Sequence, residues 1–92
     1  MPDSSPSALV KMYRTSSCPF CIMAAELLNH LGVEFEEIDL DGHPDRRGLT
    51  NSILPGHHTV PLVVVGERPL GGFDELRALH AAGTLEDALR GA

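Results

Sequence analysis

The sequence predicts a single α/β domain, in which a small mixed sheet of four strands carries helices on both faces. Three observations lead to this fold. The chain has 92 residues, of which 42% are hydrophobic, so it buries roughly 60–70% of its unfolded surface and folds alone. Short runs rich in Val and Tyr alternate with stretches at helical spacing. No internal repeat or low-complexity tract interrupts them.

The first half of the domain is predicted as strand, helix and strand. The segment "ALVKMY" (8–13) forms a strand. A helix begins near Cys18 with Pro19 at its first position, where a missing N–H costs nothing, and Gly32 ends it. The segment "EFEEIDL" (34–40) is the second strand, and its many acids indicate a sheet edge. The buried face of the helix is expected at the i, i+3, i+4 and i+7 positions, namely Cys21, Ala24, Ala25, Leu28 and Leu31.

The second half is predicted as helix, hairpin and helix. A short helix lies between 44 and 54, and a hairpin spans 62–70, with Pro69 marking the returning strand as an edge. The next helix runs from 73 to a glycine stop at 83, and Thr84 caps a last short helix. The order is therefore β-α-β-α-β-β-α, with a parallel crossover first and an antiparallel hairpin second.

Composition excludes several functions. A formal net charge of −6 without a Lys or Arg cluster argues against a nucleic-acid surface. No apolar stretch approaches the length that crosses a bilayer, and the first residues lack the pattern of a signal peptide. We therefore expect a disordered tail at 1–7, one domain over 8–92, and a cytoplasmic monomer without membrane or nucleic-acid partners.

The two cysteines of the chain form one C-P-F-C motif at Cys18 and Cys21. A structural disulfide is a poor explanation, because closing a four-residue ring stabilises a fold by only about 2 kcal/mol and cytosolic proteins seldom keep such bonds. Two ordinary buried thiols are also a poor explanation, because Cys18 lies off the apolar stripe of its helix. A lone C-x-x-C beside a β-α-β pattern is typical of redox chemistry, which is the prediction here.

The start of a helix assigns different roles to the two thiols. Unpaired N–H groups and the helix dipole stabilise an anion at Cys18, so we predict that it is the nucleophile. Cys21 faces the core one turn later and should keep a higher pKa, which suits a resolving thiol that releases a mixed disulfide. Pro19 stiffens this turn, and Phe20 provides an aromatic wall beside the reactive sulfur.

Three motifs in order, "CPFC", "TVP" (59–61) and "GGFDEL" (71–76), resemble those of the glutaredoxin family. The resemblance runs from about Leu9 to the C-terminus. It implies a thioredoxin-like fold, a cis peptide bond before Pro61, and thiol–disulfide exchange with glutathione as co-substrate. Its substrates would be proteins that carry disulfides or bound glutathione.

The resemblance also implies a glutathione site. A helix N-terminus receives a carboxylate, so Phe73 and its neighbours would donate N–H groups to the γ-glutamyl carboxylate, while Asp74 or Glu75 would take the α-amino group. The residues that would flank the cysteinyl part are Thr59, Val60 and Pro61, and those that would donate N–H groups are Gly72, Phe73 and Asp74.

The sequence departs from this family where the glycine carboxylate of glutathione would bind. Many glutaredoxins carry lysine at the position of Thr15, and Arg14 is the nearest cation here. Another low-molecular-weight thiol or a reductase protein therefore stays open as the reductant. Arg46 and Arg47 are expected to face solvent, with a smaller prospect of contacting an anionic ligand.

For several other residues, solvent exposure or core packing is an alternative explanation to a functional role. His57 and His58 are candidates for binding a carboxylate or a metal, although loop histidines are more often merely exposed. Met12 and Met23 are predicted to be core residues.

An iron–sulfur carrier, with Cys18 from two chains and two glutathione thiols as ligands, is the second functional hypothesis. In the glutaredoxin family, Pro19 counts against cluster binding, so no metal is expected.

Overall fold

The computed structural model describes residues 10–90, which fold into four strands and four helices. The predicted order β-α-β-α-β-β-α is confirmed, with one more short helix at the end, as the sequence indicates. The expected tail at 1–7 and the first two residues of the predicted strand 8–13 lie outside the described residues. The elements are β1 (Val10–Arg14), α1 (Pro19–His30), β2 (Glu36–Asp39), α2 (Arg46–Ile53), β3 (Leu62–Val65), β4 (Arg68–Gly71), α3 (Phe73–Ala81) and α4 (Leu85–Leu89).

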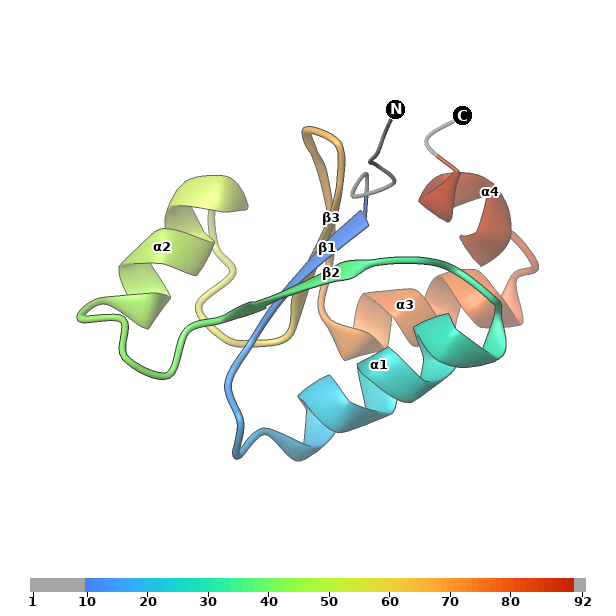
Figure 1. The fold of residues 1–92 in the computed structure, drawn as a ribbon. Helices are drawn as coiled ribbons and strands as arrows, with labels where there is room; N and C mark the ends of the chain where they lie inside the picture. Colours follow the sequence, from blue (N-terminus) through green and yellow to red (C-terminus); the bar gives the residue numbers. More distant parts are fainter. Residues whose placement is uncertain (1–9, 91–92) are drawn as a thin grey trace, which may run out of the picture.

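The four strands form one mixed sheet in the order β2-β1-β3-β4. Strand β1 is parallel to β2 and antiparallel to β3, which forms the predicted hairpin with β4. The acid-rich strand β2 and the strand that contains Pro69 are the two edges, as their sequences predict. Helices α1 and α3 cover one side of the sheet and α2 lies on the other (Figure 1).

The main core lies between the sheet and the pair α1 and α3. Met12 of β1, Val63 of β3 and Leu28 of α1 are fully buried in it. The alternation of β1 places Val10 and Met12 on this face, as expected for a strand with a period of two residues. The prediction for Met23 is wrong, because its side chain is 44% exposed. It lies two residues after Cys21, off the buried stripe of α1.

The ends of the helices follow the predicted signals. Pro19 is the first residue of α1, and Gly32 follows the helix with φ +73°, a conformation that glycine adopts freely. Gly83 ends α3 in the same way, with φ +78°. Thr84 precedes α4 as predicted, but its hydroxyl donates to Leu79 O at 3.3 Å instead of capping that helix. Within residues 10–90, no helix has the length and apolar character that a membrane span requires.

Candidate active site

Cys18 is the residue that precedes the first turn of α1. Its backbone is extended (φ −103°, ψ 105°), and its Sγ accepts a hydrogen bond from the N–H of Cys21 at 3.1 Å. The loop before it is held by Asp41, whose Oδ1 accepts from Ser16 N at 3.0 Å. The sulfur thus takes the place of a capping oxygen, and the N–H groups at the helix start favour negative charge on it.

Cys21 lies one turn further along α1, and its side chain is completely buried. The pKa of the Cys21 thiol is raised to about 12, mainly by burial and also by the adjacent Cys18 side chain. The N–H of Thr15 and the guanidinium of Arg14 act in the opposite direction. Cys21 is therefore a neutral thiol at pH 7, as expected for a group that attacks only after the first thiol has reacted.

The chain returns to Cys18 at Pro61, just before β3. The Val60–Pro61 peptide bond is cis, as the resemblance implies. The Cys18 thiol donates to Val60 O at 3.7 Å, so the reactive sulfur lies beside the main chain of this segment. The His57 side chain contacts the same segment, with its Nε2 at hydrogen-bond distance, 3.3 Å, from Pro61 O.

A hollow of about 430 Å³ opens beside this segment. Its wall includes the ring of Phe20, which packs against Phe73 with 6.1 Å between the ring centroids. The volume lies within the roughly 300–1,000 Å³ that is usual for sites of small ligands. The lining residues are Phe20, His57, Thr59, Val60, Pro61, Gly72, Phe73, Asp74 and Glu75. Apart from Arg14, the structure brings all the predicted binding residues together.

The turn from β4 into α3 forms one side of the hollow. Gly71 has φ +120°, which favours glycine, and Gly72 directly precedes the helix. Glu75 Oε1 accepts a hydrogen bond from Gly72 N at 2.7 Å. The N–H of Gly72 and one Glu75 oxygen therefore hold this turn together. The N–H groups of Phe73 and Asp74, which belong to the first helical turn, are better placed than Gly72 to receive an anion.

The comparisons with known proteins agree with this geometry. The glutaredoxin family profile matches residues 10–70. A glutaredoxin from Pseudomonas aeruginosa is 46% identical over 80 residues, which cover 87% of this chain and 94% of that protein. The chain belongs to the glutaredoxin family.

Solved glutaredoxins have the same fold. A wheat glutaredoxin superposes with a TM-score of 0.81 at 34% identity, over 94% of this chain and 83% of that chain. A buckwheat glutaredoxin–glutathione complex gives a TM-score of 0.80 at 26% identity, over 89% and 76% of the two chains. The predicted thioredoxin-like fold is confirmed, and this glutaredoxin is a thiol–disulfide oxidoreductase.

Arg14 is the predicted binding residue that this glutaredoxin keeps away from the hollow. Its Nη1 donates to Glu37 Oε1 on the neighbouring strand, and the guanidinium does not line the hollow. The proximity of Arg14 to the cysteines in sequence suggested a ligand contact. The strand register instead offers it a carboxylate partner 23 residues away.

A second hollow, of about 270 Å³, lies on the other side of Thr59 and Val60, which line both hollows of this glutaredoxin. Arg46 and Arg47 at the start of α2 line it, together with Thr15 and His58, whereas Arg14 does not. The sequence indicated only a minor role for Arg46 and Arg47. Their signal was the position of "RR" at a helix start, next to a loop that returns to the cysteines.

Proposed function

We propose that this chain is a glutathione-dependent dithiol glutaredoxin, which reduces protein disulfides and glutathionyl mixed disulfides through Cys18 and Cys21. The observation that carries the proposal is the hollow lined by Val60, whose carbonyl oxygen accepts a hydrogen bond from the Cys18 thiol. Its lining contains the residues that the family resemblance implies for glutathione. The similar buckwheat glutaredoxin forms a complex with glutathione, which supports the same ligand here.

The cysteinyl part of glutathione would lie along Val60, because an extended peptide can form main-chain hydrogen bonds with such a segment. This position brings the sulfur of glutathione to Cys18, which is 3.7 Å from Val60 O. The γ-glutamyl carboxylate would then lie at the N–H groups of Phe73 and Asp74. The carboxylate of Asp74 would bind the α-amino group, whereas Glu75 Oε1 already accepts a hydrogen bond from Gly72 N.

The glycine carboxylate would extend into the second hollow. Thr59 and Val60 separate the two hollows, so a tripeptide that follows Val60 can reach from one hollow to the other. Arg46 and Arg47 would supply the positive charge that the family usually takes from a lysine at the position of Thr15. This arrangement replaces Arg14 in the role that its sequence position suggested.

The reaction begins when the Cys18 thiolate attacks the glutathione sulfur of a mixed disulfide. A new disulfide forms between Cys18 and glutathione, and the substrate thiolate leaves and takes a proton from solvent. A second glutathione thiolate then attacks this disulfide, which releases oxidised glutathione and restores Cys18. With a protein disulfide, Cys21 instead attacks the mixed disulfide, and glutathione later reduces the Cys18–Cys21 bond.

A coupled turnover assay tests the proposal. Glutathione, glutathione reductase and NADPH are supplied with a glutathionylated peptide, and NADPH oxidation is followed. We expect the Cys18→Ser protein to be inactive and the Cys21→Ser protein to remain active on this substrate, because only Cys18 is required for it. An inactive wild type would shift the reductant to another thiol or to a reductase protein, and an active Cys18→Ser protein would refute the assigned roles.

The chain has no cysteine besides the C-x-x-C pair, which suits a reducing compartment such as the cytoplasm. The cluster-carrier hypothesis stays a prediction with its own test. A visible absorption band in anaerobically purified protein would support the carrier, and a colourless monomer with two titratable thiols would support the oxidoreductase.

A further inference from the structure

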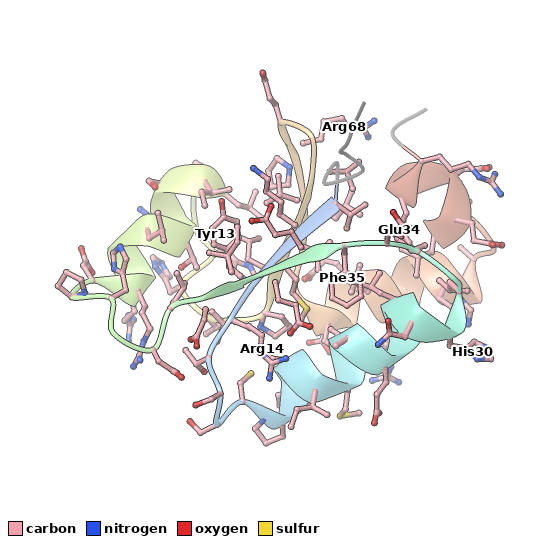
Figure 2. All side chains as sticks on the ribbon, viewed as in Figure 1. Tyr13, Arg14, His30, Glu34, Phe35 and Arg68 are labelled. Atoms are coloured by element: carbon pink, nitrogen blue, oxygen red, sulfur yellow. The ribbon has the colours of Figure 1, made fainter. Side chains whose placement is uncertain are left out.

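Arg14 and Glu37 form an ion pair on the side of the sheet that faces the active-site helix. Side chains alternate along a strand, so Arg14 lies on the same face of β1 as Met12, which is buried against α1. Figure 2 shows Tyr13 and Arg14 on opposite sides of the sheet, with Arg14 directed toward α1. Met12 pairs in register with Glu37, so this carboxylate belongs to the same face.

The helix presents Cys21 to this same face. Cys21, Ala24 and Leu28 form the buried stripe of α1, and Ala24 and Leu28 pack with Met12 in the core. Cys21 begins this stripe at the end of β1, where Arg14 continues the strand beyond Met12. Arg14 therefore lies on the face of the sheet that this end of α1 covers. In agreement with this placement, the charge of Arg14 lowers the pKa of Cys21, and both cysteines, Cys21 before Cys18, raise the pKa of Arg14.

The ion pair fixes where the charge of Arg14 lies. Asp39, the register partner of Arg14, has an Oδ1 that accepts from Asp41 N at 2.8 Å, whereas Glu37 takes the guanidinium. The side chain of Arg14 is only 20% exposed, which limits screening by solvent. A partly buried positive charge is thus held on the face of the sheet that α1 covers, which is the face toward which α1 directs the resolving thiol.

We propose that Arg14, held by Glu37, is a positioning residue for the resolving step, in which it stabilises the Cys21 thiolate as that thiolate attacks the Cys18 mixed disulfide. This inference rests on the proposed dithiol function. Cys21 loses its proton to solvent, its thiolate forms a bond with the Cys18 sulfur, and the bond from Cys18 to glutathione breaks. The leaving glutathione thiolate then takes up a proton, so the step needs no further oxidant or reductant.

Removal of the Arg14 charge should moderately slow both the formation and the opening of the Cys18–Cys21 disulfide. A nearby opposite charge raises the population of a thiolate about ten-fold or more. Because Glu37 partly offsets the charge of Arg14, we take ten-fold as the effect of Arg14 on the Cys21 thiolate. Without the charge, the Cys21 thiolate is about ten-fold less populated. Each remaining thiolate is about three-fold more nucleophilic, because nucleophilicity rises with about half of the pKa change on a logarithmic scale. The net result is that resolution should slow about three-fold. Opening of the internal disulfide should slow equally, because Cys21 is then the leaving thiolate.

The equilibrium between dithiol and disulfide should hardly change. Cys21 is a neutral thiol in the reduced protein at pH 7 and a bonded sulfur in the oxidised one, so Arg14 has no Cys21 charge to stabilise in either state. A change in both rates without a change in the equilibrium constant separates a charge effect on the reacting thiolate from a structural disturbance of the site.

The test follows both steps of oxidation in one experiment. Reduced full-length protein is mixed with oxidised glutathione at pH 7 and quenched with acid, and mass spectrometry quantifies the glutathionylated protein and the internal disulfide. Wild type is compared with Arg14→Met and with Arg14→Lys, which keeps the charge. The matched control is Lys11→Met, which removes a positive charge from the other face of β1. Thermal melting verifies that all four proteins are folded.

We expect Arg14→Met to slow resolution about three-fold and to slow glutathionylation by less, because Arg14 interacts with Cys21 more than with Cys18. The equilibrium constant should stay within two-fold of wild type. Arg14→Lys should recover most of the rate, and Lys11→Met should behave as wild type. The inference is overturned if Arg14→Met resolves at the wild-type rate or Arg14→Lys is as slow as Arg14→Met. It is also overturned if Arg14→Met slows glutathionylation equally or Lys11→Met is equally slow.

A second oxidant keeps this inference separate from the proposed function. The same comparison is made with 2-hydroxyethyl disulfide, a neutral molecule without the carboxylates of glutathione. If wild type reacts with this disulfide and not with oxidised glutathione, the glutathione proposal fails while the resolving step is still measured. Loss of the Arg14 effect with both oxidants would instead overturn the inference alone.

Discussion

The buried thiol of Cys21 should make this protein lose stability in alkaline solution. Its pKa is raised from 9.0 to about 12, with burial as the main cause. Between these two values the unfolded chain releases the proton and the folded protein keeps it. Stability is therefore fully present below about pH 9 and is lost progressively as the pH rises toward 12, because the unfolded state alone gains from ionisation.

The magnitude follows from one proton. Each pH unit within this interval lowers the free energy of unfolding by about 1.4 kcal/mol, so a rise from pH 9 to pH 10.5 removes about 2 kcal/mol. That is a large part of the roughly 5–15 kcal/mol by which small domains are stable. Other groups also titrate in alkaline solution, so the Cys21 contribution has to be isolated by a difference between two proteins.

Urea unfolding monitored by circular dichroism provides that difference. The Cys18→Ser protein is compared with the Cys18→Ser/Cys21→Ala protein, so that no internal disulfide can form at high pH. From pH 9 to pH 10.5, the Cys18→Ser protein should lose up to about 2 kcal/mol of stability relative to the Cys18→Ser/Cys21→Ala protein, because burial, the largest cause of the shift, acts in this pair while the contribution of the Cys18 thiol does not. Parallel stability curves over that range would show that the thiol ionises as readily in the fold as in the unfolded chain, which would refute the reasoning.

Two further predictions concern the hollows. Gly71→Ala should destabilise the fold by about 1–3 kcal/mol in urea unfolding, because Gly71 has φ +120° and a Cβ there would meet Glu75 Cγ at 2.7 Å. Gly42→Ala is the control, because a Cβ at Gly42 meets nothing within 4 Å. An equal loss of stability in the two variants would contradict the role of the Gly71 conformation. Arg46→Gln should raise KM for a glutathionylated peptide about two- to five-fold with kcat retained. Arg90→Gln, on the C-terminal side of α4, should leave KM unchanged, and an unchanged KM in both proteins would remove Arg46 from the binding site.

Local patterns predicted most of this fold because they determine most of it. The spacing of apolar residues fixes which face of α1 is buried, and Pro19 and Gly32 mark its ends. The acids of β2 predicted an edge, since charged side chains are compatible with water there and discourage further pairing. These signals act within a few residues of the chain, so they can be read without knowing the rest of the structure.

The contacts that sequence reasoning missed depend on register and on packing between distant segments. Arg14 was predicted to hold a ligand, yet it faces Glu37 because β1 and β2 pair in a particular register. Glu75 was predicted as a contact for an amino group, yet its first partner is the N–H of Gly72, three residues earlier. Arg46 reaches the second hollow only because α2 is packed beside the loop that leads to the cis proline.

The asymmetry between the two thiols comes from the turn that joins them. A helix advances one turn in 3.6 residues, so Cys21 lies nearly above Cys18 and can donate its N–H to the first sulfur at 3.1 Å. Its own side chain then points into the core with Ala24 and Leu28 and is cut off from solvent. The turn that supplies a hydrogen bond to the first sulfur therefore also hides the second. The resolving thiol consequently needs a charge within the fold to ionise, and Arg14 is the residue that β1 brings to it.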